Sequence, residues 1–109
     1  RLPLNTEMRI RIAGKEYEAL KCENISMGGM CLHVTEKFNK GAKGKLWLTQ
    51  AFGPGEVLSF ETPFKILWVE PVPPGSTALC MGIEFVKMKR KHADSLLEIL
   101  RRQGTLESI

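Results

Sequence analysis

Short runs in which apolar and polar residues alternate occupy most of the chain, which is typical of half-buried β-strands. Residues 8–12 alternate in this way, Ala13-Gly14-Lys15 predicts a turn, and residues 17–23 predict a second strand that forms a hairpin with the first. Further strands are predicted over residues 30–34, 45–49, 57–60, 64–69 and 78–88. Residues 51–55 predict a loop, and 57–60 with 64–69 are either two strands or one long strand bent at Pro63.

The spacing of apolar residues changes near the end of the sequence. From about residue 93 to 102, Leu96, Leu97 and Leu100 lie at helical spacing among charged residues, and Gly104 is a plausible stop. This stripe must cover something apolar, either the open end of the strand domain or a partner or second copy of the chain. Strands followed by one helix indicate an all-β domain, a small antiparallel barrel with a capping helix.

Length and composition limit the class of protein. The 109 residues make a single domain, and 43% hydrophobic with 26% charged residues is typical of a soluble globular protein. No apolar run is long enough to span a bilayer, so membrane insertion is not expected. The net charge of +4, with a basic cluster at residues 87–91, indicates either a solvated surface or an attraction for an anionic ligand. Aromatic residues do not interleave along a strand, which disfavours nucleic acid as a partner.

Cysteine and histidine give no sign of a metal or catalytic site. Cys22, Cys31 and Cys80 are odd in number and form no Cys-x-x-Cys pair, which predicts buried thiols without a disulfide framework and a cytoplasmic location. Cys31 and His33 could form half of a metal site, but no second pair has suitable spacing. His92 is expected to be exposed. Without a nucleophile–base arrangement or a phosphate-binding loop, the sequence predicts a protein that is not an enzyme and needs no cofactor.

The candidate chemistry lies in Asn24-Ile25-Ser26-Met27-Gly28-Gly29, between two predicted strands. Asn24 and Ser26 are two residues apart, so in extended chain an amide and a hydroxyl point the same way. Gly28 and Gly29 remove side-chain bulk, so the backbone can turn sharply or lie against a ligand. The alternative is a simple turn in which Asn24 and Ser26 bond their own backbone.

This constellation resembles the PilZ family of bacterial cyclic di-GMP receptors, whose pattern is Arg-x-x-x-Arg followed by Asp/Asn-x-Ser-x-x-Gly. Asn24, Ser26 and Gly29 match the second motif, and Arg1 stands where the second arginine is expected. The first arginine would precede the sequence. The resemblance continues through Gly82-Ile83-Glu84-Phe85 and the closing helix.

The resemblance implies a six- to seven-stranded split barrel with a C-terminal capping helix. Residues 1–7 would form a ligand loop, 8–88 the barrel and 91–103 the helix. The implied ligand is cyclic di-GMP, bound by Arg1, Asn24, Ser26, Gly28 and Gly29, with Arg1 gripping phosphate and the guanine edge. Binding would change the conformation of the module or its contacts with a protein partner or attached domain. The alternative is a PilZ-like protein–protein interaction module that no longer binds nucleotide.

Overall fold

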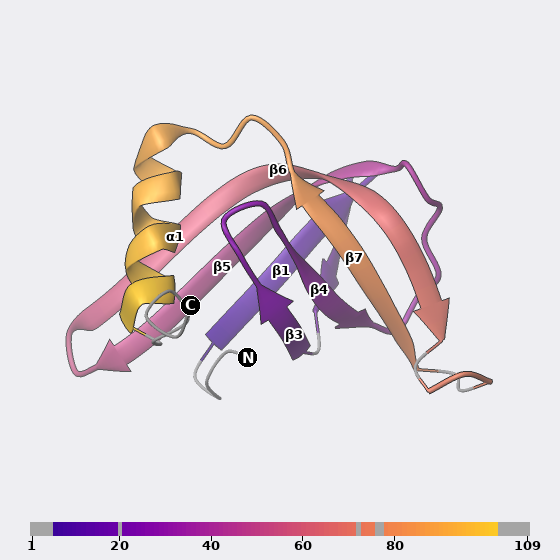
Figure 1. The fold of residues 1–109 in the computed structure, drawn as a ribbon, viewed down its shortest axis with the longest axis horizontal. Coiled ribbons are helices and arrows are strands. Elements are labelled where there is room, and N and C mark those ends of the chain that lie inside the picture. The colour runs from indigo at the N-terminus through magenta and orange to yellow at the C-terminus, as the bar shows by residue number, and fades with distance from the viewer. Residues whose placement is uncertain (1–5, 20, 72, 76–77, 103–109) are drawn as a thin grey trace.

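The computed structural model describes residues 6–19, 21–71, 73–75 and 78–102. These residues form seven strands and one helix (Figure 1). The elements are β1 (Thr6–Ile12), β2 (Lys15–Glu18), β3 (Lys21–Ile25), β4 (Gly29–Val34), β5 (Lys43–Gly53), β6 (Glu56–Pro71), β7 (Leu79–Phe85) and α1 (Arg90–Arg102).

All strand pairs are antiparallel and belong to one sheet with the order β2-β1-β5-β6-β7-β4-β3. The sheet curls strongly, with β6 arching over the other strands and α1 beside its first half (Figure 1). No pairing joins the edge strands β2 and β3 within the described residues, so the barrel is split. The predicted all-β barrel with a C-terminal helix is confirmed.

Strand β6 is one continuous element that changes partner along its length. Residues 56–65 pair with β5, and residues 64–71 pair with β7. The Pro63 carbonyl accepts a hydrogen bond of 2.9 Å from the N–H of Val86. Since N and C=O of one strand residue face the same edge, the missing N–H of Pro63 does not interrupt the β5 ladder. The single long strand, rather than two strands, is therefore the correct alternative.

Four predicted boundaries differ from the observed ones. Residues 17–23 do not form one strand, because β2 and β3 lie at opposite edges of the sheet and only β2 pairs with β1. Residues 51–53 extend β5, so the predicted loop shrinks to a turn at Pro54 and Gly55, whose φ of 77° suits glycine. β7 ends at Phe85, and β1 begins at Thr6, inside the predicted ligand loop.

The core fills the concave side of the sheet and the gap beneath α1. The helix packs against β6, and its fully buried side chains are Leu96, Ile99 and Leu100. The helix therefore covers the barrel itself, as expected if the leucine stripe closes the open end of the strand domain. Its buried stripe contains Ile99, whereas Leu97 is only half-buried.

The cysteine prediction was wrong in one respect. Cys22 is a buried thiol, but Cys31 and Cys80 form a disulfide between β4 and β7. The register places Cys31 opposite Gly82 and Cys80 opposite His33, so the two cysteines are diagonal neighbours with Cα atoms 6.6 Å apart. They are 49 residues apart in sequence, and only the strand order brings them together.

Candidate functional site

The motif forms the turn between β3 and β4. The N–H of Ser26 donates to the Gly29 carbonyl at 2.9 Å, and the Ser26 hydroxyl donates to the same oxygen at 3.4 Å. The hydroxyl also accepts from the N–H of Gly28 at 3.2 Å. Ser26 thus closes its own turn, as the simpler interpretation predicts, while remaining exposed to solvent.

A β-bulge directs Asn24 outward. Cys22 pairs with Leu32 and Asn24 with Cys31, so position 23 is an extra residue in β3. In a regular strand Asn24 would share the buried face of Cys22, but the bulge reverses the alternation. Asn24 and Ser26 are consequently both exposed, with the buried Ile25 between them. The structure brings the predicted amide and hydroxyl to one outward face.

The two motif glycines have different surroundings. Gly29 lies against β7, where an added Cβ would overlap the carbonyl oxygen of Ile83. Gly28 is exposed with open space at its Cβ position, and its carbonyl accepts from the N–H of Phe85 at 2.9 Å. Gly29 is therefore needed for packing, while Gly28 leaves free surface beside Ser26. Arg1, the remaining predicted site residue, lies outside the described residues.

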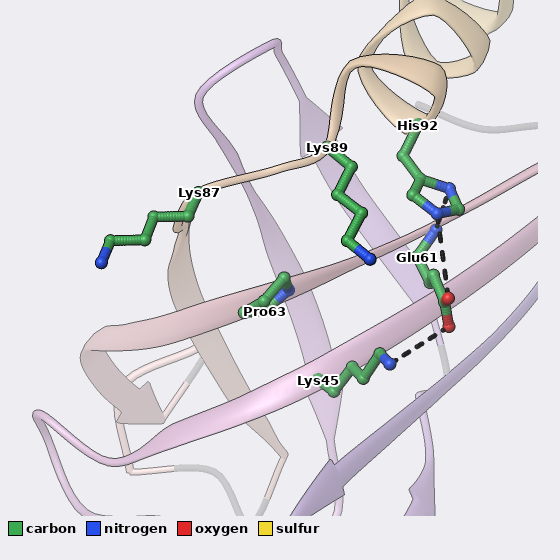
Figure 2. Close-up of a pocket in the computed structure, with 6 residues that line it drawn as sticks. All are labelled: Lys45, Glu61, Pro63, Lys87, Lys89 and His92. Atoms are coloured by element: carbon green, nitrogen blue, oxygen red, sulfur yellow. Dashed lines mark hydrogen bonds and ion pairs between the residues drawn. The ribbon is translucent and has the colours of Figure 1, made fainter.

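A second feature is a shallow pocket of about 110 Å³ where the β7–α1 linker crosses β5 and β6 (Figure 2). Its lining residues are Lys45, Glu61, Pro63, Lys87, Lys89 and His92. The backbone N–H of Glu61 donates to Nδ1 of His92 at 3.2 Å. Because Nδ1 accepts, the neutral imidazole carries its proton on Nε2, which lies 3.8 Å from the Glu61 carboxylate. The His92 side chain is only 15% exposed, so the prediction of an exposed histidine was wrong.

Glu61 is the acidic centre of this pocket. Desolvation raises its pKa, but the hydrogen bond and charge of Lys45, 3.4 Å away, act in the opposite direction together with the Trp47 hydrogen bond. The resulting pKa lies below the ordinary glutamate value, so Glu61 is a carboxylate at neutral pH. The contacts between Glu61 and His92 join the start of α1 to the sheet. None of the lining residues is a serine, cysteine or threonine nucleophile.

The predicted basic cluster lies close to the motif turn. Phe85, which hydrogen-bonds Gly28, is followed within four residues by Lys87 and Lys89. Neither lysine has an ion-pair partner among the described residues, and Figure 2 shows Lys87 pointing away from Glu61. Lys87 therefore adds positive charge near the exposed end of the motif, whereas the Lys89 side chain points toward the Glu61 side of the pocket.

Within the described ranges, no group of three or more histidine, cysteine or acidic side chains comes together. No helix among these residues is long and apolar enough to cross a membrane.

The model of the PilZ domain family matches residues 1–102. The chain belongs to the PilZ domain family. The family predicted from the motif is thus confirmed, and PilZ domains are regulatory receptor modules rather than enzymes.

A solved structure supports the fold of this PilZ domain. The chain is similar to the Bacillus subtilis inhibitor of motility (MotI/DgrA), with a TM-score of 0.74 and 22% sequence identity. The match covers 90% of this chain and 46% of that chain, so the PilZ domain described here spans less than half of MotI/DgrA. At this identity the likeness concerns the fold alone. No curated protein matches the sequence significantly.

Proposed function

We propose that this PilZ domain is a cyclic di-GMP receptor module. The observation that carries the proposal is the outward presentation of Asn24 and Ser26 by a bulged strand of a PilZ fold. A bulge interrupts strand pairing and therefore has a cost, and bulges are common next to functional sites where a side chain must be directed. Here the side chains directed outward are the two polar residues of the family motif.

Each proposed contact follows from the chemistry of the side chain. Asn24 offers both amide donors and a carbonyl acceptor, which suits the edge of guanine. Ser26 accepts one bond from the turn and can reorient its hydroxyl toward a ligand, because its bond to Gly29 is long and exposed. Arg1 supplies a planar, permanently charged donor for phosphate and guanine. Lys87 and Lys89 raise the local positive potential that attracts an anionic dinucleotide.

Binding by Arg1 would fix the N-terminal segment against the outer face of the barrel. The segment held there would present a new surface to a protein partner or attached domain, a common form of switching in receptor modules.

A second candidate is a PilZ-like interaction module that works through protein contacts without nucleotide. The observation in its favour is that the Ser26 hydroxyl already has two bonds inside its own turn. A hydroxyl engaged in this way stabilises the turn whether or not a ligand is present.

Calorimetric titration with cyclic di-GMP separates the two candidates, with GTP and a short RNA as control ligands. The receptor proposal predicts saturable binding of cyclic di-GMP alone. Asn24→Ala should weaken it, whereas Asn24→Asp should retain it, since the family motif accepts either residue. No heat with either nucleotide would favour the interaction module, and equal heats for cyclic di-GMP and GTP would contradict the receptor proposal.

A further inference from the structure

Two lysines lie opposite each other where the loop after β4 enters β5. Lys43 is the first residue of β5 and pairs in register with Lys65 of β6. Both lysines are exposed, and Lys65 stands between the buried Phe64 and Ile66, so the pair lies on the outer face of the sheet. Directly opposite residues of an antiparallel pair have Cβ atoms about 4.5–5.5 Å apart. The two charged side chains therefore start from neighbouring positions on one surface.

The loop brings a third lysine to this surface. The N–H of Gly41 donates to the Ile66 carbonyl at 2.8 Å, and the N–H of Ile66 donates to the Ala42 carbonyl at 2.9 Å. These two bonds hold the loop along β6, next to Lys65. Lys40 is exposed and comes directly before the bonded residues. Together, Lys40, Lys43 and Lys65 form the lysine cluster.

No ion pair neutralises the lysine cluster. None of its three side chains has a salt-bridge partner among the described residues. The sequence from residue 37 to residue 55 contains several lysines and no aspartate or glutamate. Glu84 pairs in register with Lys65 from the β7 side, but no salt bridge joins the two. Like charges directly opposite each other destabilise a sheet, so the Lys43–Lys65 pair costs stability until an anion lies on it.

An exposed apolar residue borders the lysine cluster. Leu67 follows Lys65 by two residues on β6 and is 41% exposed. It is the extra residue at the irregularity between Ile66 and Trp68, so it has no cross-strand partner on β7. Protein interfaces combine apolar and charged contacts, whereas most hydrogen bonds to a nucleic acid go to its phosphates and sugars. Leucine beside lysine therefore favours a protein segment as the anionic partner.

We infer that the lysine cluster is a docking surface for an acidic segment of a protein partner. The inference goes beyond nucleotide binding, because the cluster lies on β5, β6 and the preceding loop rather than on the motif turn. Carboxylates of the segment supply the anions that Lys43 and Lys65 lack, and an apolar side chain of the same segment covers Leu67. Charge complementarity of this kind selects the partner and speeds association.

The test uses a labelled peptide of the sequence Glu-Glu-Leu-Glu-Glu-Leu-Glu-Glu, with binding followed by fluorescence anisotropy. The parent should bind this peptide saturably at low ionic strength, and added salt should weaken the complex. The double variant Lys43→Gln/Lys65→Gln should raise Kd about fivefold or more. Leu67→Ser should also weaken binding. Lys91→Gln removes the same charge from an exposed position on α1 and should bind like the parent.

Thermal melting supplies a second measurement that a purely structural role would not produce. Lys43→Gln removes the repulsion from Lys65, so its melting temperature should rise by about 1–3 °C while its affinity for the peptide falls. A loss of both stability and affinity would mean that Lys43 supports the fold, and the inference would be wrong.

The remaining outcomes separate this inference from the receptor function. No peptide binding by the parent, or equal binding by the double variant, overturns the docking surface. Tighter binding of a short RNA than of the peptide would show that the cluster recognises phosphate, which also overturns it. Cyclic di-GMP titrated into the same variants should give the Kd of the parent, and a loss there with peptide binding intact would assign the lysines to the nucleotide site. A parent that binds the peptide but no cyclic di-GMP would remove the receptor function and leave the docking surface standing.

Discussion

At the scale of single residues, the adjacent glycines of the motif respond differently to a methyl group. Gly29→Ala places a Cβ against the Ile83 carbonyl, so strand β4 must move away from β7. We expect the free energy of unfolding to fall by about 1–3 kcal/mol, as in other overpacked sites. Gly28→Ala is the control, because its Cβ enters open space. Chemical denaturation should show a clear loss for Gly29→Ala only, and equal losses would contradict the distinction.

Ser26 contributes a hydroxyl to the proposed ligand site. Ser26→Ala should weaken cyclic di-GMP binding by about 1 kcal/mol, the typical value of one hydrogen bond. Because the turn bonds of Ser26 are exposed, melting should change little. Ser26→Thr keeps the hydroxyl and should bind more tightly than the alanine variant. Titration that gives one Kd for all three proteins would remove Ser26 from the site.

Glu61 makes stability depend on pH in a definite direction. Its pKa is lowered in the folded state, so the carboxylate stabilises the protein above the ordinary value of 4.5. This contribution disappears as the pH falls through the lower, folded value. The melting temperatures of the parent and of Glu61→Gln should therefore differ most near neutral pH and converge in acid. A constant difference from pH 7 to pH 3 would show that Glu61 is not the titrating group.

The positions of the candidate site residues were only partly predictable from the sequence. The two-residue spacing predicted that Asn24 and Ser26 share a face, and both are exposed. That outcome depends on the bulge at position 23, because Asn24 would otherwise share the buried face of Cys22. The contact between His92 and Glu61 was missed, because the two residues are 31 positions apart and nothing in the local pattern links them.

At the scale of secondary structure, the helix is fixed to the barrel at both ends. His92 contacts Glu61 near its start, and Arg102 near its end pairs with Glu56 at 2.8 Å and Glu98 at 3.0 Å. These two carboxylates raise the pKa of Arg102 above its ordinary value. Between these ends, the buried stripe supplies the apolar contact.

The neighbouring leucines of the helix offer a direct comparison. Leu96 is fully buried in the core, whereas Leu97 is half-buried. Leu96→Ala should lower the free energy of unfolding by about 2–5 kcal/mol. Leu97→Ala should cost clearly less. Denaturation curves measure both values, and sedimentation of Leu97→Ala checks self-association. A larger loss for Leu97→Ala than for Leu96→Ala would mean that the helix turns Leu97 toward the core in place of Leu96.

Strand pairing was harder to predict than strand existence. Residues 17–23 contain no glycine or proline that would signal a turn, yet Tyr17 packs edge-on against Phe38, with ring centres 4.9 Å apart, while Cys22 enters the core opposite Leu32. Periodicity describes which face is buried but not which strand is the neighbour. The same limitation hid the Cys31–Cys80 disulfide, since their proximity follows from the pairing of β4 with β7.

At the scale of the whole molecule, positive charge is distributed unevenly. Arg9 and Arg11 each lie 3.7 Å from Glu16, which offsets their charge and agrees with a solvated strand face. Lys87 and Lys89 have no such partner within the described residues. The excess charge of the domain thus includes a basic segment beside the motif turn, a placement that net charge alone could not predict.

The N-terminal segment provides the test of charge recognition. Arg1→Ala should weaken cyclic di-GMP binding more than Ser26→Ala, because charged hydrogen bonds are roughly twice as strong as neutral ones. Arg1→Lys should restore only part of the affinity, since a point charge cannot reproduce the planar guanidinium. A chain extended so that an added arginine completes Arg-x-x-x-Arg with Arg1 should bind more tightly. If lysine and arginine are equivalent in calorimetry, Arg1 acts only through its charge.

The partner change along β6 has a mechanical consequence. Within the described residues, β6 is the only strand that hydrogen-bonds both to β5, on the side of β1 and β2, and to β7, on the side of the motif strands. The helix also packs on β6. A twist imposed on β7 at the outer face is therefore transmitted to the helix-bearing half through one continuous backbone. Residues 64 and 65, which pair with both β5 and β7, are where the two halves of the sheet are joined.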